Sequence, residues 1–139
     1  MEVTMSLITW DEKYSVNVQK FDQDHKKLVQ LINDLHQAML DHKANDVLGV
    51  IFIELANYTK DHFKAEEEAM VKYSYPNFEA HKKLHTELVA QVDKLWDDFK
   101  AGKLMMSITV LNFLRDWLVK HILGEDSKYT AFFNAKGLV

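Results

Sequence analysis

The sequence contains no cysteine among its 139 residues. A disulfide, a thiolate-bound zinc ion and an iron–sulfur cluster are therefore excluded, because each of them needs cysteine sulfur. Any metal bound by this chain must be held by nitrogen and oxygen atoms. Proline occurs once and glycine four times, while 47% of the residues are hydrophobic. This composition favours a helical globular protein over a disordered chain or an all-β fold.

The chain also lacks a long apolar run and a concentration of one charge. Its longest apolar stretch, residues 47–53, contains Gly49 and is too short to span a bilayer. The first ten residues lack the basic start and apolar stretch of a secretion signal. The net charge of −4 is mild, and no basic stripe suits nucleic acid. We expect one domain over residues 1–139, in a cytoplasmic protein that neither spans a membrane nor binds nucleic acid.

Apolar residues recur at steps of three and four in the first half of the chain, which is the pattern of amphipathic helices. One such segment runs from about Asp22 to about Ala44. A second continues to about Tyr73, and either Asn45 or Asp46 can cap its start, because their side chains accept hydrogen bonds from free backbone N–H groups. The first half therefore predicts two long helices.

The second half is divided by a proline and two glycines. Pro76 forbids helix at its position, so a third helix follows it and stops near Gly102. Ser107 can cap a fourth helix, which breaks at Gly124 and leads into a short turn or helix through Phe133.

Residues 1–21 carry apolar and aromatic side chains without helical spacing, which predicts an extended N-terminal arm over the core. Four helices joined by short loops predict an all-α fold, an up-down-up-down four-helix bundle. We place this bundle and a short C-terminal helix or turn in residues 22–133.

Histidine is paired at short spacing with a second histidine or a carboxylate in three places, and a lone histidine precedes them. The residues are His25, His62 with Glu66, His81 with His85, and His121 with Asp126. A step of four residues on a helix turns a side chain by about 40° and moves it about 6 Å, so both members of a pair share one stripe. The five-residue step from His121 to Asp126 requires a bend, which we expect Gly124 to permit. In an alternating bundle all four positions fall at one end.

The number of ligands narrows the choice of metal. Imidazole and carboxylate groups suit iron, zinc, copper or nickel, and affinity order alone does not choose among them. Five imidazoles and two carboxylates are too many for one tetrahedral zinc ion. Two octahedral ions bridged by both carboxylates would use all seven groups and leave an open position. A bridged di-iron centre is the best fit.

With these residues the chain resembles the hemerythrin family, in particular the single-domain bacterial hemerythrins. The matching residues span nearly the whole chain and are Asp22, His25-Lys26-Lys27-Leu28, His62-Phe63, Glu66-Glu67, Met70, Tyr75-Pro76, His81, His85, Trp117-Leu118, His121-Ile122, Asp126 and Tyr129. Asp24 departs from the family pattern, because relatives often have glutamine there.

The resemblance implies reversible binding of dioxygen by two iron ions that share an oxo or hydroxo bridge. By position, one iron would be held by His81, His85 and His121, the other by His25 and His62, and both by the bridging carboxylates Glu66 and Asp126. The iron with two histidines would keep a vacant position for dioxygen.

An oxygen carrier also needs an apolar pocket over the vacant position, because water and protons would otherwise expel the bound oxygen in reduced form. Helical spacing places six apolar residues near the histidines, namely Leu28, Phe63, Leu114, Trp117, Leu118 and Ile122. The resemblance points to Leu28, Trp117, Leu118 and Ile122, although apolar residues at this spacing are often plain core.

Four further polar residues are expected to stay outside the centre. His36 lies eleven residues after His25 and points the same way, but roughly 16 Å deeper in the bundle. We expect His42, Glu67 and Glu68 to lie on the solvated surface.

Three functions remain open from the sequence. The expected one is oxygen storage, or delivery to an oxygen-consuming enzyme, by a monomer that is not itself an enzyme. A di-iron oxidase, peroxidase or nitric oxide reductase is the second, although the paired Glu-x-x-His motifs of ferritin-like oxidases are missing. The third is an oxygen or iron sensor, which would need a partner protein because we expect no fused signalling domain in a chain of this length.

Overall fold

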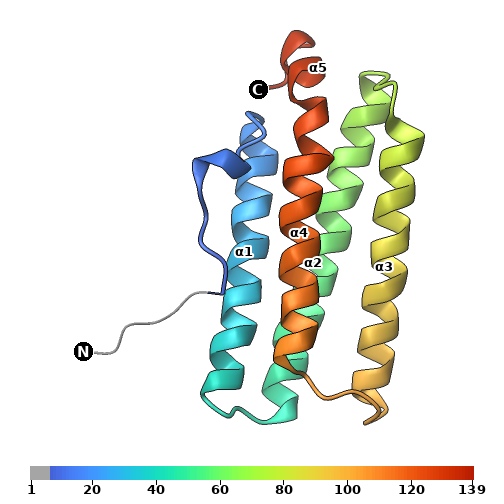
Figure 1. Ribbon diagram of the computed structural model, residues 1–139. Helices are drawn as coiled ribbons and strands as arrows, with labels where there is room; N and C mark the ends of the chain where they lie inside the picture. Colours follow the sequence, from blue (N-terminus) through green and yellow to red (C-terminus); the bar gives the residue numbers. More distant parts are fainter. Residues whose placement is uncertain (1–6) are drawn as a thin grey trace.

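The computed structural model describes residues 7–139, and its regular elements over this range are all helices (Figure 1). The long helices are α1 (Gln19–Leu40), α2 (Asn45–Lys72), α3 (Phe78–Lys100) and α4 (Ile108–Gly124). The short ones are the 3-10 helices η1 (Glu12–Tyr14) and η2 (Asp126–Tyr129), and α5 (Thr130–Ala135). The long helices alternate in direction, with the α2–α3 connection and α5 at one end of the bundle (Figure 1). The predicted up-down-up-down bundle is therefore confirmed.

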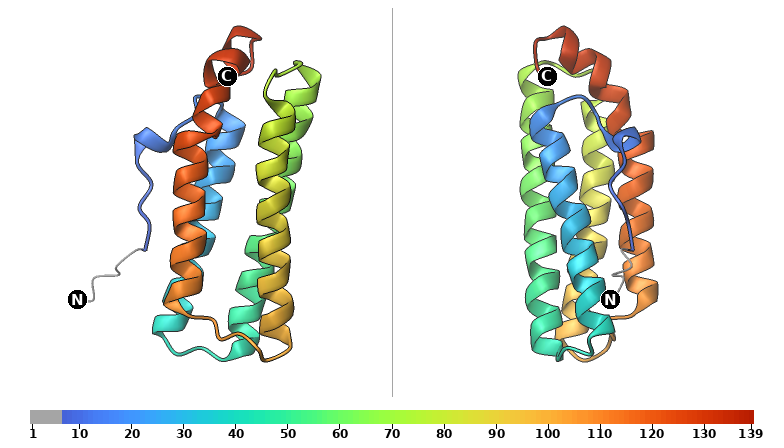
Figure 2. Two further views of the ribbon diagram at one scale, coloured as in Figure 1. Left: turned by 45° about the vertical axis from the view of Figure 1, so that its right-hand side comes forward. Right: turned by 90° about the vertical axis from the view of Figure 1, so that its left-hand side faces the viewer.

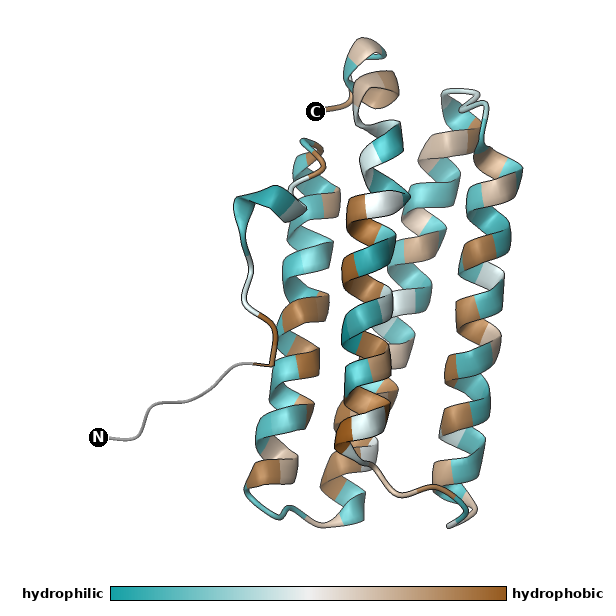
Figure 3. Ribbon diagram, in the orientation of Figure 1, coloured by the Kyte–Doolittle hydropathy of each residue, from teal (hydrophilic) through white to brown (hydrophobic). Residues whose placement is uncertain are grey.

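The core fills the space between the four long helices. Leu35, Phe52 and Leu111 are at most 1% exposed and come from three different helices. Apolar residues recur in bands along each helix, separated by hydrophilic ones, as amphipathic helices require (Figure 3). No helix within residues 7–139 offers an apolar stretch of the length that a bilayer requires.

The N-terminal arm lies along the bundle and contacts both its first and its last helices (Figure 2). Val16 and Val18 are 1% and 0% exposed, so the arm contributes to the core. The backbone of Ile8 exchanges two hydrogen bonds with the side chain of Asn33 in α1, at 3.1 and 2.7 Å. Near its other end, the carbonyl oxygen of Val16 accepts a bond from the Thr130 hydroxyl at 2.8 Å. Residues 1–6 of the predicted arm lie outside the described residues.

The first helix spans residues 19–40 instead of the predicted 22–44. It begins earlier because Phe21, four residues before His25, belongs to the same buried face and is 3% exposed. It ends earlier because His42 adopts a positive φ of 54°. The left-handed region normally favours glycine or asparagine, so the sequence carries no marker for this end.

The two capping predictions differ in outcome. Asn45 is already the first helical residue of α2, and Ala44 occupies the cap position without a side-chain hydrogen bond, so that prediction was wrong. Ser107 caps α4 as predicted, because its hydroxyl accepts a bond from the Val110 N–H at 3.4 Å.

Two leucines of α1 provide a matched test of the core. Leu35 is 0% exposed and Leu40 is 52% exposed. We expect Leu35→Ala to lower the free energy of unfolding by about 2–5 kcal/mol, because it leaves a cavity. Leu40→Ala should change it by less than about 0.5 kcal/mol. Urea unfolding followed by circular dichroism measures both, and equal losses would contradict this account of the core.

Candidate metal centre

All seven predicted ligands meet at one end of the bundle. Their exposed fractions range from 0% for Glu66 to 5% for His121. They come from every long helix and from η2, as His25 (α1), His62 and Glu66 (α2), His81 and His85 (α3), His121 (α4) and Asp126 (η2). Their ligand atoms form two groups, and within each group all atoms lie within 4.8 Å of one another. The groups are Glu66, His81, His85, His121 and Asp126, and His25, His62, Glu66 and Asp126.

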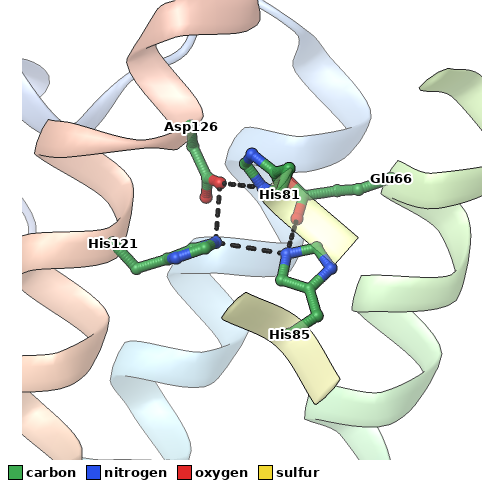
Figure 4. Close-up of side chains that lie close together, drawn as sticks. All are labelled: Glu66, His81, His85, His121 and Asp126. Atoms are coloured by element: carbon green, nitrogen blue, oxygen red, sulfur yellow. Dashed lines mark hydrogen bonds and ion pairs between the residues drawn. The ribbon is translucent and has the colours of Figure 1, made fainter. Parts of the chain in front are cut away.

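Asp126 reaches both groups with its two carboxylate oxygens. Oδ1 lies 2.9 Å from Nε2 of His81 and 3.0 Å from Nε2 of His121 (Figure 4). Oδ2 lies 3.1 Å from Nε2 of His25, in the other group. The carboxylate therefore stands between the two sets of imidazoles.

Glu66 is the second carboxylate that lies between the two groups of imidazoles. Its Oε1 lies 3.3 Å from Nε2 of His62 and 3.3 Å from Nε2 of His85, one from each group. Its Oε2 accepts a hydrogen bond from the hydroxyl of Tyr129, which is 0% exposed. This tyrosine fixes the carboxylate, a role that its position in the sequence did not reveal.

Several polar atoms of the cluster point toward one another without forming hydrogen bonds. Oε1 of Glu66, Nε2 of His81 and both carboxylate oxygens of Asp126 are buried and have no hydrogen bond of acceptable geometry within residues 7–139. Nε2 of His62 faces Nε2 of His25 at 2.9 Å, where only one of two ring nitrogens can carry a shared proton. Because buried polar groups are normally satisfied, this arrangement fits atoms directed at cations between them.

Asp126 returns to His121 by a route different from the predicted one. Gly124 is helical and has no positive φ, and an added Cβ there would meet nothing within 4 Å. The chain instead leaves α4 through Glu125, with φ −106° and ψ −49°, and winds as the 3-10 helix η2. This change of winding places the Asp126 carboxylate beside His121, so the expected glycine bend was wrong.

Two further carboxylates contact the outer nitrogens of the imidazoles. Nδ1 of His62 lies 2.8 Å from Oδ2 of Asp24, and Nδ1 of His85 lies 3.0 Å from Oε2 of Glu67. With the proton on Nδ1, each ring donates to its carboxylate and turns the lone pair of Nε2 inward, as a metal ligand requires. Glu67 was predicted to be solvated, yet its side chain is 24% exposed and binds His85, so that prediction was wrong. Glu68 is exposed as predicted.

The metal-free chain balances its buried charges by shifting pKa values. Burial alone would lower the pKa of His62, but the charge of Glu66 and the bond to Asp24 raise it to about 10. Burial would raise the pKa of Asp24, yet the bonds from His62 and Lys20 hold it at about 2. Against burial, neighbouring histidines lower the pKa of Glu66 and of Asp126. The carboxylates therefore stay ionised, which suits them to binding a cation.

An apolar cavity of about 30 Å³ opens onto this cluster. It meets His25, His62, His121 and Asp126 at one end and continues between the helices. Five of the six predicted pocket residues line it, namely Leu28, Phe63, Leu114, Trp117 and Leu118. Ile122 is 2% exposed but is not among the lining residues, which places it in the plain core.

Comparison with known proteins agrees with this geometry. The family model described as "Hemerythrin HHE cation binding domain" matches residues 16–133. The chain belongs to the hemerythrin family. A bacteriohemerythrin of Methylococcus capsulatus is 35% identical over 90% of this chain and 95% of its own length. A bacteriohemerythrin of Stenotrophomonas maltophilia is 32% identical over 90% of this chain and 80% of its own length.

The likeness extends beyond bacteria and to solved hemerythrin structures. A myohemerythrin of Theromyzon tessulatum is 32% identical over 86% of this chain and 88% of its own length. The crystal structure of a wild-type hemerythrin, 34% identical, superposes with a TM-score of 0.86 and covers 90% of this chain and 96% of that one. The hemerythrin fold is therefore shared over nearly the whole molecule.

Two histidine substitutions test the ligand assignment. We expect His121→Ala to lower the iron content below two per chain, because one of the larger group of imidazoles is lost. His36→Ala removes a half-buried histidine of α1 that belongs to neither group and should leave the iron content unchanged. Elemental analysis of both purified variants gives the answer, and full iron in His121→Ala would remove this residue from the ligand set.

The raised pKa of His62 predicts how metal uptake depends on pH. A proton held with a pKa of about 10, against 6.5 normally, must be displaced by the metal. Metal uptake at neutral pH should therefore release protons, and the apparent affinity for the metal should rise with pH until about pH 10. In the metal-free chain the same proton adds to the free energy of unfolding. This contribution is complete below pH 6.5 and is lost as the pH rises through about 10. Calorimetric zinc titrations in buffers of different ionisation enthalpy measure the release, and a buffer-independent heat would contradict it.

Proposed function

We propose that this protein binds dioxygen reversibly at a pair of iron ions held by its seven buried ligands. The observation that carries the proposal is the sharing of two carboxylates, Glu66 and Asp126, between two groups of imidazoles. A single ion would not need ligands that reach in two directions. Nitrogen and oxygen donors in this number suit two six-coordinate ions, and the family to which the chain belongs supports iron.

The two groups of ligands are unequal, and this inequality supports a place for dioxygen. Beside the shared carboxylates, one group has three imidazoles and the other has only His25 and His62. The cavity meets both of these histidines but only His121 of the other three, so the position with fewer ligands is the more open to the apolar space. When bound, two ferrous ions would supply the electrons with which dioxygen is held.

The chain's own residues would keep that position dry and fixed. Leu28, Leu114 and Leu118 line the cavity with hydrocarbon, which disfavours entry of water and protons. Asp24 and Glu67 hold the rings of His62 and His85, and Tyr129 holds Glu66. A rigid and dry site favours release of dioxygen unchanged over its reduction.

We infer that the role is storage or delivery of oxygen, in the cytoplasm, by a single chain that passes dioxygen to an oxygen-consuming enzyme. The relatives named bacteriohemerythrin and myohemerythrin support an oxygen-binding role over an enzymatic one. A di-iron oxidase or peroxidase, and an oxygen or iron sensor, are the alternatives that the following experiment separates.

Repeated oxygenation tests the proposal. The protein is loaded with ferrous iron without air, its iron is counted, and its visible spectrum is followed through cycles of oxygen and argon. We expect two irons per chain and an absorption band that appears with oxygen and disappears with argon over several cycles. Irreversible conversion to a ferric state in the first cycle would favour an enzyme or sensor, and fewer than two irons would overturn the centre itself.

Two leucines of α4 provide a matched control for the role of the cavity. Leu118 lines the cavity and Leu111, two turns away on the same helix, does not. Both are buried, at 6% and 0% exposed. Leu118→Ala should shorten the lifetime of the oxygenated protein in this experiment more than Leu111→Ala does, because it enlarges the space beside the centre.

A further inference from the structure

Lys20, on the surface of α1, is connected to the buried centre by the side chain of Asp24. Its Nζ lies 2.8 Å from Oδ1 of Asp24. The lysine side chain is 64% exposed, whereas that of Asp24 is 3% exposed. The hydroxyl of Tyr58 donates to the same oxygen at 3.2 Å. A surface cation and a phenol thus share one oxygen of a buried carboxylate.

The second oxygen of this carboxylate faces the centre. Oδ2 of Asp24 accepts from Nδ1 of His62 at 2.8 Å, and the His62 side chain is 1% exposed. Lys20, Asp24 and His62 therefore form a line of two charged contacts that leads from solvent to a metal-ligating ring. Because Asp24 is buried, solvent and salt screen its interaction with His62 only weakly.

We propose that Lys20 is a positioning residue that sets the reduction potential of the iron pair through Asp24 and His62. The inference rests on the proposed function, because it needs iron on His62. A carboxylate that accepts from Nδ1–H makes an imidazole a stronger donor and favours the ferric state. Lys20 withdraws part of that negative charge and so favours the ferrous state, which is the state that takes up dioxygen.

The other group of ligands has an outer carboxylate without such a lysine. Glu67 accepts from Nδ1 of His85 at 3.0 Å in the same way. Within residues 7–139, no lysine or arginine forms an ion pair with Glu67, whereas Lys20 does so with Asp24. The outer carboxylate of the iron position that faces the cavity is thus the one whose charge is partly offset.

The midpoint potential of the iron pair tests the inference. Lys20→Met keeps most of the apolar stem and removes the charge, so it should lower the potential. Asp24→Asn removes the acceptor charge and should raise the potential, with a loss of about 10- to 100-fold in metal affinity. Because Lys20 acts through Asp24, Lys20→Met should shift the potential much less in the Asp24→Asn background than in the wild type.

A second surface lysine provides the matched control. Lys64 lies two residues from His62, its side chain is 77% exposed, and it pairs with Glu68 at 4.0 Å. Lys64→Met removes the same charge near the centre without touching Asp24, and should leave the potential unchanged. Lys20→Arg, which keeps the charge, should restore most of the wild-type potential.

The outcomes separate the inference from the proposed function. Fewer than two irons per wild-type chain would contradict the proposed function itself. With two irons bound, an unchanged potential in Lys20→Met would overturn the inference alone. Equal shifts in Lys20→Met and Lys64→Met, or an equal Lys20→Met shift with and without Asp24, would show a general surface field instead of transmission through Asp24.

Discussion

The burial of two carboxylates among five imidazoles is the constraint on which the rest of this structure depends. Taking even one ion out of water costs several kcal/mol, and this chain buries its cluster at 5% exposure or less. Neighbouring opposite charges offset part of that cost, which is why the pKa of His62 rises to about 10 while those of Glu66 and Asp126 fall. Cations between the ligand groups would offset more, so metal binding and stability of this end of the bundle are coupled.

At this centre the aromatic residues that pack the core also orient the imidazole rings. The ring of Phe63 stacks on His85 with centroids 3.8 Å apart and planes 2° apart, and Trp117 stacks on His121 at 4.4 Å and 14°. These aromatic rings line the cavity as well, so the residues that keep it apolar also fix two of the imidazoles. Tyr129 also joins Glu66 to the C-terminal helix α5, because its ring lies 4.8 Å, between centroids, from that of Phe133.

The charged contacts around the imidazoles connect this interior to the surface. Asp24 and Glu67 orient the rings to which they are bonded, and they differ in how far their charge is offset. Lys20 stands at the solvent end of one of these contacts and is absent from the other. Lys20 on the surface of α1 is therefore linked to the buried ring of His62 without contacting it, because Asp24 joins the two and lies in a poorly screened environment.

The helices and the members of the buried cluster could be predicted from the sequence alone, because helical periodicity and spacings of three and four residues are local properties of the chain. The sequence therefore predicted the bundle, the end at which the histidines gather, and most of the cavity lining. It failed where the answer depends on the relative rotation of helices or on a backbone choice without a marker residue. Glu67 points outward on α2 by periodicity, yet α3 brings His85 to it; His42, not a glycine, ends α1; and 3-10 winding, not Gly124, returns Asp126. The contact between Glu67 and His85 joins two helices, and the two backbone conformations carry no marker residue, so only the tertiary structure decided all three.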